Sequence, residues 1–122
     1  MNIRATRRKY GQNYLIDKGV LFEMGNTINS KSNDSFIEIG PGLGALTEQI
    51  NKESIKILAI DVDEQNINYL KRKYNGPADI QFVHGDFLKF NLPVDGNSQR
   101  IVGNLPYNIS TQIILKLIDD YE

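Results

Sequence analysis

Residues 36–47 have the sequence FIEIGPGLGALT, in which a short apolar run ends in three glycines and a proline. The apolar run is typical of a buried strand, and the residues after the glycines are suited to begin a helix. Glycine permits a tight turn and lets the backbone approach a ligand at the start of a helix. The segment therefore favours a cofactor loop over a simple turn. Because Gly40, Gly42 and Ala45 also fit the dinucleotide fingerprint, the loop alone does not identify the cofactor.

Four apolar runs rich in isoleucine, valine and phenylalanine predict strands. They are Phe36–Ile39, Ile55–Ile60, Ile80–Val83 and Arg100–Val102. Helical patterns lie around and between these strands. The expected caps and inward faces are Asp17 with Val20, Leu21, Met24 and Ile28; Asp63 with Ile67, Leu70 and Tyr74; and Ser110 or Thr111 with Ile113, Ile114, Leu117 and Ile118.

The alternation of strands and helices predicts an α/β fold with a parallel, Rossmann-like sheet. A doubly wound sheet whose first strand is central has the order 3-2-1-4, and its ligand crevice opens at the carboxyl ends of strands one and four. Such domains usually continue beyond a fourth strand. Residues 1–122 are therefore interpreted as one unit, the N-terminal, cofactor-binding portion of such a domain, without its C-terminal strands.

Composition excludes several classes of protein. The chain has no cysteine, one histidine and no apolar run near the roughly 20 residues of a membrane span. A metal centre, a membrane protein and thiol chemistry are not expected, and the cytoplasm is the expected location. Fourteen basic and fifteen acidic side chains give a net charge of −1, yet five of the bases and one acid lie in residues 1–18. Residues 1–16 are interpreted as a basic arm that contacts phosphates, with a solvated tail as the alternative.

Two aspartates stand at the ends of the second and third expected strands. Asp61 lies about 20 residues after the glycine loop, where a carboxylate can accept hydrogen bonds from both hydroxyls of a ribose. A helix cap is the alternative, but Asp63 already offers one. Asp86 is suited to accept a hydrogen bond from an adenine amine, with Phe87 or Leu88 packed on the ring. Gly-Asp after a strand also suits a plain turn.

The fourth strand is followed by Asn104-Leu105-Pro106-Tyr107, and no turn requirement explains this order of side chains. The amino group of adenine is a poor nucleophile, so a site must accept its hydrogens and direct its lone pair. The Asn104 side chain and the Leu105 main chain offer carbonyl acceptors, while Pro106 fixes the local φ angle. Tyr107 offers a ring on which a flipped base can stack. A loop that simply ends the strand is the alternative.

Five segments of the chain, taken together, resemble the ribosomal-RNA adenine N6-dimethyltransferases of the KsgA type. They are Tyr10–Leu15 (YGQNYL), Glu38–Gly44 (EIGPGLG), Asp61, Gly85–Asp86 and Asn104–Ser110 (NLPYNIS). The joint occurrence of the first and last segments is much more specific than the glycine loop. The resemblance implies transfer of methyl groups from S-adenosyl-L-methionine to N6 of adenines in small-subunit ribosomal RNA, with the pre-30S particle as partner.

The resemblance also implies the roles of individual residues. Cofactor contacts are expected at Gln12, Asn13, Leu15, Gly40, Gly42, Asp61, Asp86 and Asn104, and the target adenine is expected to be held by Asn104, Leu105, Pro106 and Tyr107. Many relatives carry glutamate at the position of Asp61, whose side chain is one methylene shorter.

Three further expectations follow from length and from the glycine loop. Full chains of the family are roughly twice as long and add further strands and a helical RNA-binding domain, so a cofactor-binding module without transfer activity is one alternative. A nicotinamide-dependent oxidoreductase is another, because the glycine loop also fits a dinucleotide. A chain that ends after the fourth strand is expected to self-associate through that strand's edge.

Overall fold

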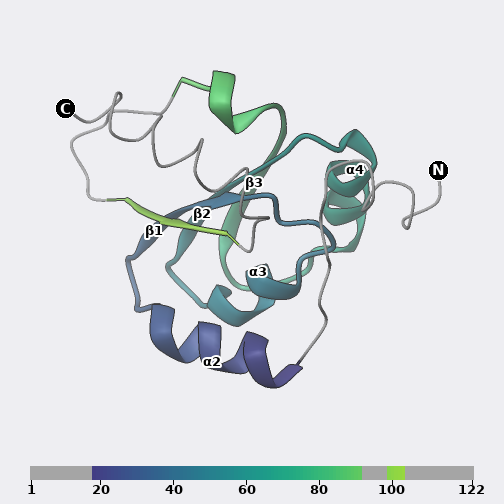
Figure 1. Ribbon diagram of the computed structural model, residues 1–122. Helices are drawn as coiled ribbons and strands as arrows, with labels where there is room; N and C mark the ends of the chain where they lie inside the picture. Colours follow the sequence, from purple (N-terminus) through teal and green to yellow (C-terminus); the bar gives the residue numbers. More distant parts are fainter. Residues whose placement is uncertain (1–17, 92–98, 104–122) are drawn as a thin grey trace.

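The described residues, 18–91 and 99–103 of the computed structural model, are built on a parallel four-stranded sheet (Figure 1). The strands are β1 (Ser35–Ile39), β2 (Lys56–Asp61), β3 (Asp79–His84) and β4 (Arg100–Val102). Their order is β3-β2-β1-β4, and all three pairings are parallel. The expected α/β class, the four strands and the 3-2-1-4 order are confirmed.

In the described part of the chain, one α-helix precedes the sheet, and two α-helices and one 3-10 helix lie between the strands. The helices are α2 (Lys18–Ile28), α3 (Ala45–Ile50), α4 (Glu64–Lys73) and the 3-10 helix η1 (Phe87–Lys89). Asp63 caps α4, because its side chain accepts hydrogen bonds from the backbone N–H groups of Gln65 and Asn66. This cap is as expected, whereas Asp17 and residues 110–118 lie outside the described residues. Within the described ranges, no helix is both long enough and apolar enough to cross a membrane.

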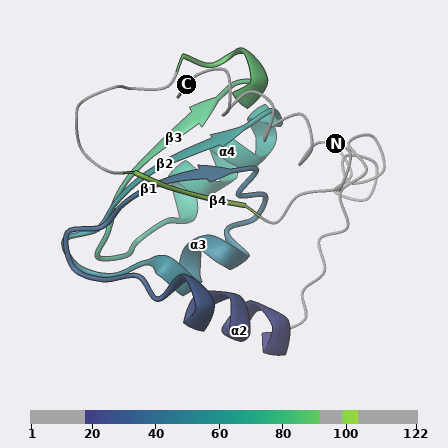
Figure 2. The same cartoon turned by 60° about the vertical axis from the view of Figure 1, so that its left-hand side comes forward.

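The sheet separates two apolar clusters, because successive side chains of a strand point to opposite faces. One cluster lies on the face covered by α3 and α4, and α2 packs beside α3 (Figures 1 and 2). The other lies on the face covered by η1. The first cluster contains Phe36, Ile50, Ile55, Ile57, Ala59, Ile67, Leu70, Ala78 and Phe82; the second contains Ile37, Ile39, Ile60 and Phe87. Each large side chain buried in this way contributes about 1.5–3 kcal/mol.

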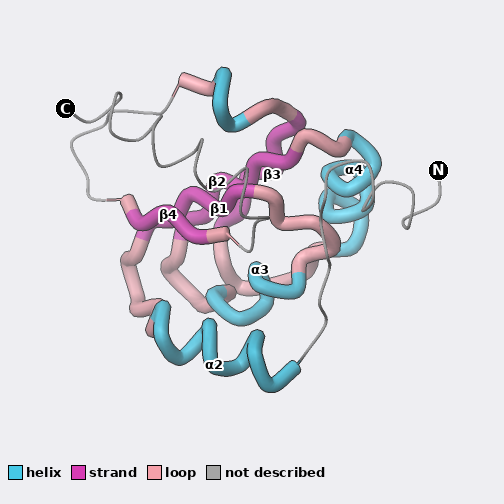
Figure 3. The backbone as a smooth tube through the Cα atoms, viewed as in Figure 1, coloured by secondary structure: helices cyan, strands magenta, loops and turns pink. Residues whose placement is uncertain are grey.

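The same alternation places the polar residues of the strands. Glu38 follows Phe36 by two positions in β1, and Asp61 follows Ala59 by two positions in β2, so both acids face the helical side of the sheet. The strands lie side by side (Figure 3), and because they are parallel, their carboxyl ends lie at the same edge of the sheet. The two acids therefore lie at the carboxyl ends of adjacent strands, next to the glycine loop.

One expected inward position in α2 is wrong. Leu21 is buried as expected, but Val20 is 45% exposed. The main described packing of α2 is against α3, and a pocket lies between α2 and β4. Val20 lies on the wall of that pocket instead of in the core.

Candidate cofactor site

The loop between β1 and α3 depends on glycine. Gly40, Gly42 and Gly44 have φ angles of 65°, 59° and 90°, in the left-handed region that costs other residues about 1–2 kcal/mol. The Gly40 N–H donates to the carbonyl of Ile60 at 2.8 Å, which ties the start of the loop to β2. The expected strand, glycine loop and helix are confirmed.

Asp61 is joined directly to this loop. It is the last residue of β2, and only 1% of its surface is exposed. Its Oδ2 accepts the N–H of Gly42 at 2.9 Å, and its Oδ1 accepts the N–H of Asp63 at 2.9 Å. The amide Nδ2 of Asn66 lies 3.5 Å from Oδ2. Since Asp63 is the cap of α4, Asp61 is neither that cap nor a surface acid.

Two opposing effects act on the ionisation of Asp61. Burial raises the pKa of its carboxyl, while hydrogen bonds from Asp63, Gly42 and Asn66 oppose that rise. A buried carboxylate needs such donors, because an ionised group without them is strongly disfavoured. The site thus contains a carboxylate whose position is fixed by its hydrogen bond to the glycine loop.

A second buried acid lies beside the loop and was not among the expected site residues. Glu38 precedes the loop in β1, is 1% exposed and accepts a 2.5 Å hydrogen bond from the hydroxyl of Thr47 in α3. Burial raises the pKa of Glu38 to about 7. An acid inside an otherwise apolar strand, two residues before the first of three glycines, is the sequence signal that could have identified Glu38.

The end of β3 differs in part from expectation. Asp86 caps η1, with its Oδ1 accepting the N–H of Leu88 at 3.0 Å, so the turn geometry is present. Of the two side chains expected to pack on an adenine, Phe87 is not available, because it is 3% exposed and packs against Ile37, Ile39 and Ile60, whereas packing by Leu88 stays a prediction. Burial of apolar surface favours packing of the Phe87 ring on this face of the sheet, because the apolar side chains there need a cover.

The only histidine of the chain, His84, has a structural contact. Its side chain is exposed, and Nε2 lies 3.2 Å from the carbonyl of Val62. A carbonyl oxygen only accepts, so Nε2 carries the hydrogen of this bond. Among the described residues, no group of three or more potential ligand side chains is arranged to hold a metal ion.

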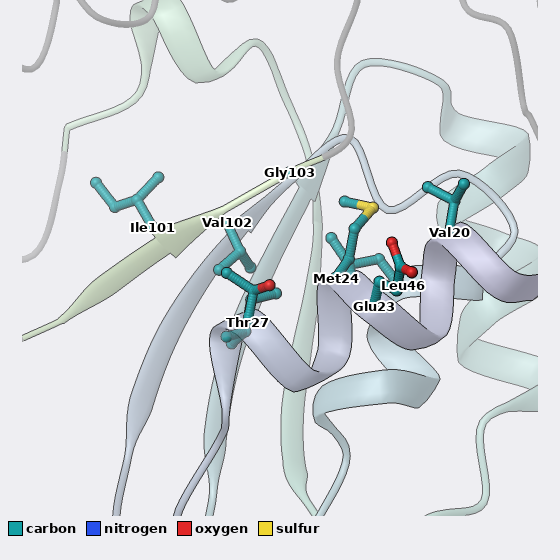
Figure 4. Close-up of a pocket in the computed structure, with 9 residues that line it drawn as sticks. Val20, Glu23, Met24, Thr27, Leu46, Ile101, Val102 and Gly103 are labelled. Atoms are coloured by element: carbon teal, nitrogen blue, oxygen red, sulfur yellow. The ribbon is translucent and has the colours of Figure 1, made fainter.

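A pocket of about 420 Å³ lies between α2 and β4. Figure 4 shows Val102 projecting toward Thr27 of α2 and Ile101 pointing to the other side of the strand. Gly103, which immediately precedes Asn104, also lines the pocket. Most of its wall is apolar, with Glu23 as its charged member. The pocket adjoins the point where β4 leads into the predicted target-base segment.

The profile of a family described as ribosomal RNA adenine dimethylase matches residues 3–122. This chain belongs to that family. Ribosomal RNA small subunit methyltransferase A of Pseudomonas fluorescens (strain Pf0-1) is 40% identical over 117 residues, which are 93% of this chain and 43% of the relative. The chain spans less than half the length of that relative.

Two solved structures have a similar fold. The 23S rRNA methyltransferase ErmE has a TM-score of 0.77 and 25% identity, with 89% of this chain and 44% of that chain covered. A dimethyladenosine transferase from Plasmodium falciparum has a TM-score of 0.65 and 31% identity, with 83% and 36% covered. The fold is therefore that of the ribosomal RNA adenine dimethylases, and family membership implies S-adenosyl-L-methionine as the cofactor.

The expected site residues of this member of the family fall into two groups. Those that the structure describes lie at one edge of the sheet: Gly40, Gly42, Asp61 and Asp86. Those outside the described residues are Gln12, Asn13, Leu15, Asn104, Leu105, Pro106 and Tyr107. The described part fits a nucleoside, because left-handed glycines let the backbone approach a ligand and a buried carboxylate on the adjacent strand can accept a hydrogen bond from a hydroxyl.

Proposed function

We propose that this protein is an S-adenosyl-L-methionine-dependent methyltransferase that dimethylates N6 of adenines in small-subunit ribosomal RNA. The observation that carries the proposal is the bond between Asp61 and Gly42, which fixes a buried carboxylate to the glycine loop at the carboxyl edge of the sheet. Membership of the ribosomal RNA adenine dimethylase family supports methyl transfer over a nicotinamide-dependent reaction.

The cofactor contacts are proposed for residues on both sides of the crevice. Asp61 accepts a hydrogen bond from a ribose hydroxyl at Oδ1, and Asp86 accepts one from the adenine amine through acceptor positions that Leu88 does not use. The loop at Gly40 and Gly42 lets the backbone come close to the ligand. Gln12, Asn13, Leu15 and Asn104 complete the proposed set of cofactor contacts.

The target base is proposed to be held by the segment that follows β4. The Asn104 side-chain carbonyl and the Leu105 main-chain carbonyl accept the two hydrogens of N6, so the nitrogen lone pair points at the methyl group. Pro106 fixes the backbone between them, and Tyr107 stacks on the base. When bound, S-adenosyl-L-methionine supplies a methyl group on a sulfonium. The protein's contribution to the rate is then chiefly positioning.

The proposed substrate is small-subunit rather than large-subunit RNA. The relative at 40% identity is named for the small subunit, whereas the structure named for 23S rRNA is 25% identical. We further propose the pre-30S particle as the partner and the cytoplasm as the place of action. The basic residues Arg7, Arg8 and Lys9 are proposed to contact RNA phosphates, an interaction that weakens as salt is raised.

The edge of the sheet is proposed to permit self-association of this chain. In the described residues, β4 pairs with β1 alone and presents its other edge. An open edge strand is a template for pairing with another chain. Light scattering over a concentration series tests this, and a monomer at every concentration contradicts it.

Calorimetric titration with S-adenosylhomocysteine tests the cofactor proposal. We expect saturable binding that Asp61→Ala weakens strongly, whereas the same substitution at Asp79, an exposed acid at the other end of the sheet, leaves it unchanged. Binding of NADH in place of S-adenosylhomocysteine would overturn the proposal.

Transfer is tested with a labelled methyl donor and small-subunit particles that lack the modification. Asn104→Ala is expected to abolish incorporation into the RNA. Binding of cofactor without any transfer by the wild-type chain would reduce the proposal to its cofactor-binding part.

A further inference from the structure

Asn66 is a buried polar residue next to the site and belongs to no set of expected contacts. It lies in the first turn of α4 and is 6% exposed. Its backbone N–H lies 3.4 Å from Oδ1 of the capping residue Asp63, and its side-chain Nδ2 lies 3.5 Å from Oδ2 of Asp61. The helix cap therefore sets the position from which the amide reaches the carboxylate.

The acceptor positions of Asp61 are nearly filled by protein donors. A carboxylate has about four acceptor positions, two on each oxygen. Oδ2 is approached by the Gly42 N–H and the Asn66 amide, and Oδ1 by the Asp63 N–H. Of the donors in the described residues, none fills the fourth position, on Oδ1, which is left for a ribose hydroxyl. The donors come from the glycine loop, the turn after β2 and helix α4, so together they fix the plane of the carboxylate.

Among these donors, the Asn66 amide is the one supplied by a side chain. The N–H groups of Gly42 and Asp63 are backbone groups that persist in almost any variant. The hydrogen bond from Asn66 lowers the pKa of Asp61, against the rise caused by burial. Without the amide, Oδ2 keeps the Gly42 bond but loses its second donor, so the carboxylate is held less firmly in its plane and binds a proton more readily.

The shorter side chain at this position makes orientation important. Asp61 has one methylene fewer than glutamate, so its carboxylate stays close to β2 and has less freedom to adjust to a ligand. A ribose contact from this position requires the carboxylate to be ionised and correctly turned when the nucleoside arrives.

We propose that Asn66 is a positioning residue for the cofactor, which holds the Asp61 carboxylate in the orientation that accepts a hydrogen bond from a ribose hydroxyl. The inference rests on the proposed function, because it assumes that Asp61 binds the nucleoside. Asn66 itself acts through Asp61 and is not a ligand contact.

Other titratable groups surround Asp61 and are unchanged in the test below. Glu38 lies on β1, Asp63 lies in the turn before α4, and His84 is the register partner of Asp61 on β3. The His84 ring is directed to the carbonyl of Val62. A change in pH dependence caused by a substitution at Asn66 is therefore attributable to the lost amide.

The test compares Asn66→Leu with Asn68→Leu, the same change at an exposed position of the same helix. Binding of S-adenosylhomocysteine to the full chain is measured by calorimetry from about pH 5 to pH 9. Asn66→Leu is expected to weaken binding about tenfold, since a hydrogen bond to a charged group is lost. In this variant the loss of affinity at acidic pH begins at a higher pH than in the wild type, because Asp61 takes up its proton at a higher pH. Asn68→Leu matches the wild type in both respects.

A second variant covers the case in which leucine disturbs folding. Asn66→Ser keeps a polar group that is too short to reach Asp61, and it is expected to show the same loss and the same shift. Wild-type affinity in either folded Asn66 variant would overturn the inference, as would weaker binding with an unshifted pH profile, which assigns Asn66 a purely structural role. Failure of the wild type to bind S-adenosylhomocysteine would instead overturn the proposed function, and this inference with it.

Discussion

The hydroxyl of Thr47 donates a 2.5 Å hydrogen bond to Oε1 of Glu38, and both side chains are buried. Glu38 lies in the strand that enters the glycine loop, and Thr47 lies in the helix that leaves it. The bond therefore joins the two ends of the loop beneath its backbone. Burial raises the pKa of Glu38 from 4.5 to about 7, so ionisation of Glu38 destabilises the folded state.

Replacing Glu38 by glutamine is expected to stabilise the fold above neutral pH. Below pH 4.5 the side chain is protonated in both folded and unfolded states and contributes no pH dependence. Between pH 4.5 and about 7 the folded state binds the extra proton, so wild-type stability falls as pH rises. Glutamine keeps an acceptor for Thr47 and has no charge to bury. At alkaline pH the free energy of unfolding of the variant should exceed that of the wild type by about 3 kcal/mol.

Urea unfolding at acidic and mildly alkaline pH measures this effect. The free energy of unfolding of Glu38→Gln, compared with that of the wild type, should increase from the first pH to the second. Parallel pH profiles for the two proteins would show that Glu38 is ionised in the folded state without cost.

Gly42 is expected to be much less tolerant than Gly85, although both donate backbone hydrogen bonds to Asp61. The Gly42 N–H bonds the Asp61 side chain at φ 59°, and the Gly85 N–H bonds the Asp61 carbonyl. Alanine at position 42 costs about 1–2 kcal/mol in the left-handed region and displaces the loop from Asp61. At Gly85, whose φ angle is not in that region, an added Cβ meets no atom within 4 Å.

The two alanine variants are compared by thermal unfolding and by S-adenosylhomocysteine titration. Gly42→Ala should lose both stability and affinity, and Gly85→Ala should lose neither. Equal behaviour of the two would mean that the loop does not depend on its left-handed glycine.

Asp63 is expected to contribute to stability as a cap. Its side chain accepts the N–H groups of Gln65 and Asn66, and its own N–H is bound to Asp61. Asp63→Ala should cost about 1 kcal/mol, whereas Asp63→Asn keeps an acceptor oxygen and most of this energy. Denaturant titration of both variants measures the difference, and equal losses would assign the effect to charge alone.

The arrangement of the strands could be predicted from local sequence patterns, and so could the positions of Asp61 and Asp63. Apolar strands that alternate with helices allow few sheet topologies, because parallel crossovers are right-handed. With the first strand at the centre of the sheet, the strand order 3-2-1-4 follows. Asp63 was identifiable because a cap acts within its own first turn. Asp61 was identifiable because it ends a strand at a fixed distance from the glycine loop.

The remaining features depend on contacts between distant parts of the chain. The partner of Glu38 is nine positions away, across the loop, and the Asp61 side chain reaches a loop residue 19 positions before it. Val20 and Phe87 were placed incorrectly because periodicity shows which side chains are apolar, not which surface covers them. Val20 is exposed because α2 packs mainly on α3, and Phe87 is buried because η1 packs on the other face of the sheet.

Arg100 is expected to hold β4 in place more by its neutral contacts than by its ion pair. Its guanidinium donates to the carbonyl of Ile28 at the end of α2, lies 5.1 Å from the centre of the Phe36 ring and is 3.3 Å from Oδ2 of Asp34. The ion pair is partly exposed, with side-chain exposures of 43% and 27%, so Asp34→Asn should cost less than about 1 kcal/mol. Arg100→Met should cost about 2 kcal/mol, because the carbonyl bond and the ring contact are lost as well.

Salt separates the two contributions in Arg100→Met, because screening weakens the exposed ion pair and leaves the carbonyl bond and ring contact largely intact. Unfolding in low salt and in about 1 M salt should therefore give similar losses for this variant. A loss that disappears in high salt would mean that the ion pair with Asp34 dominates. Since β4 leads through Gly103 to Asn104, the same variant should also lower methyl transfer more than it lowers cofactor binding.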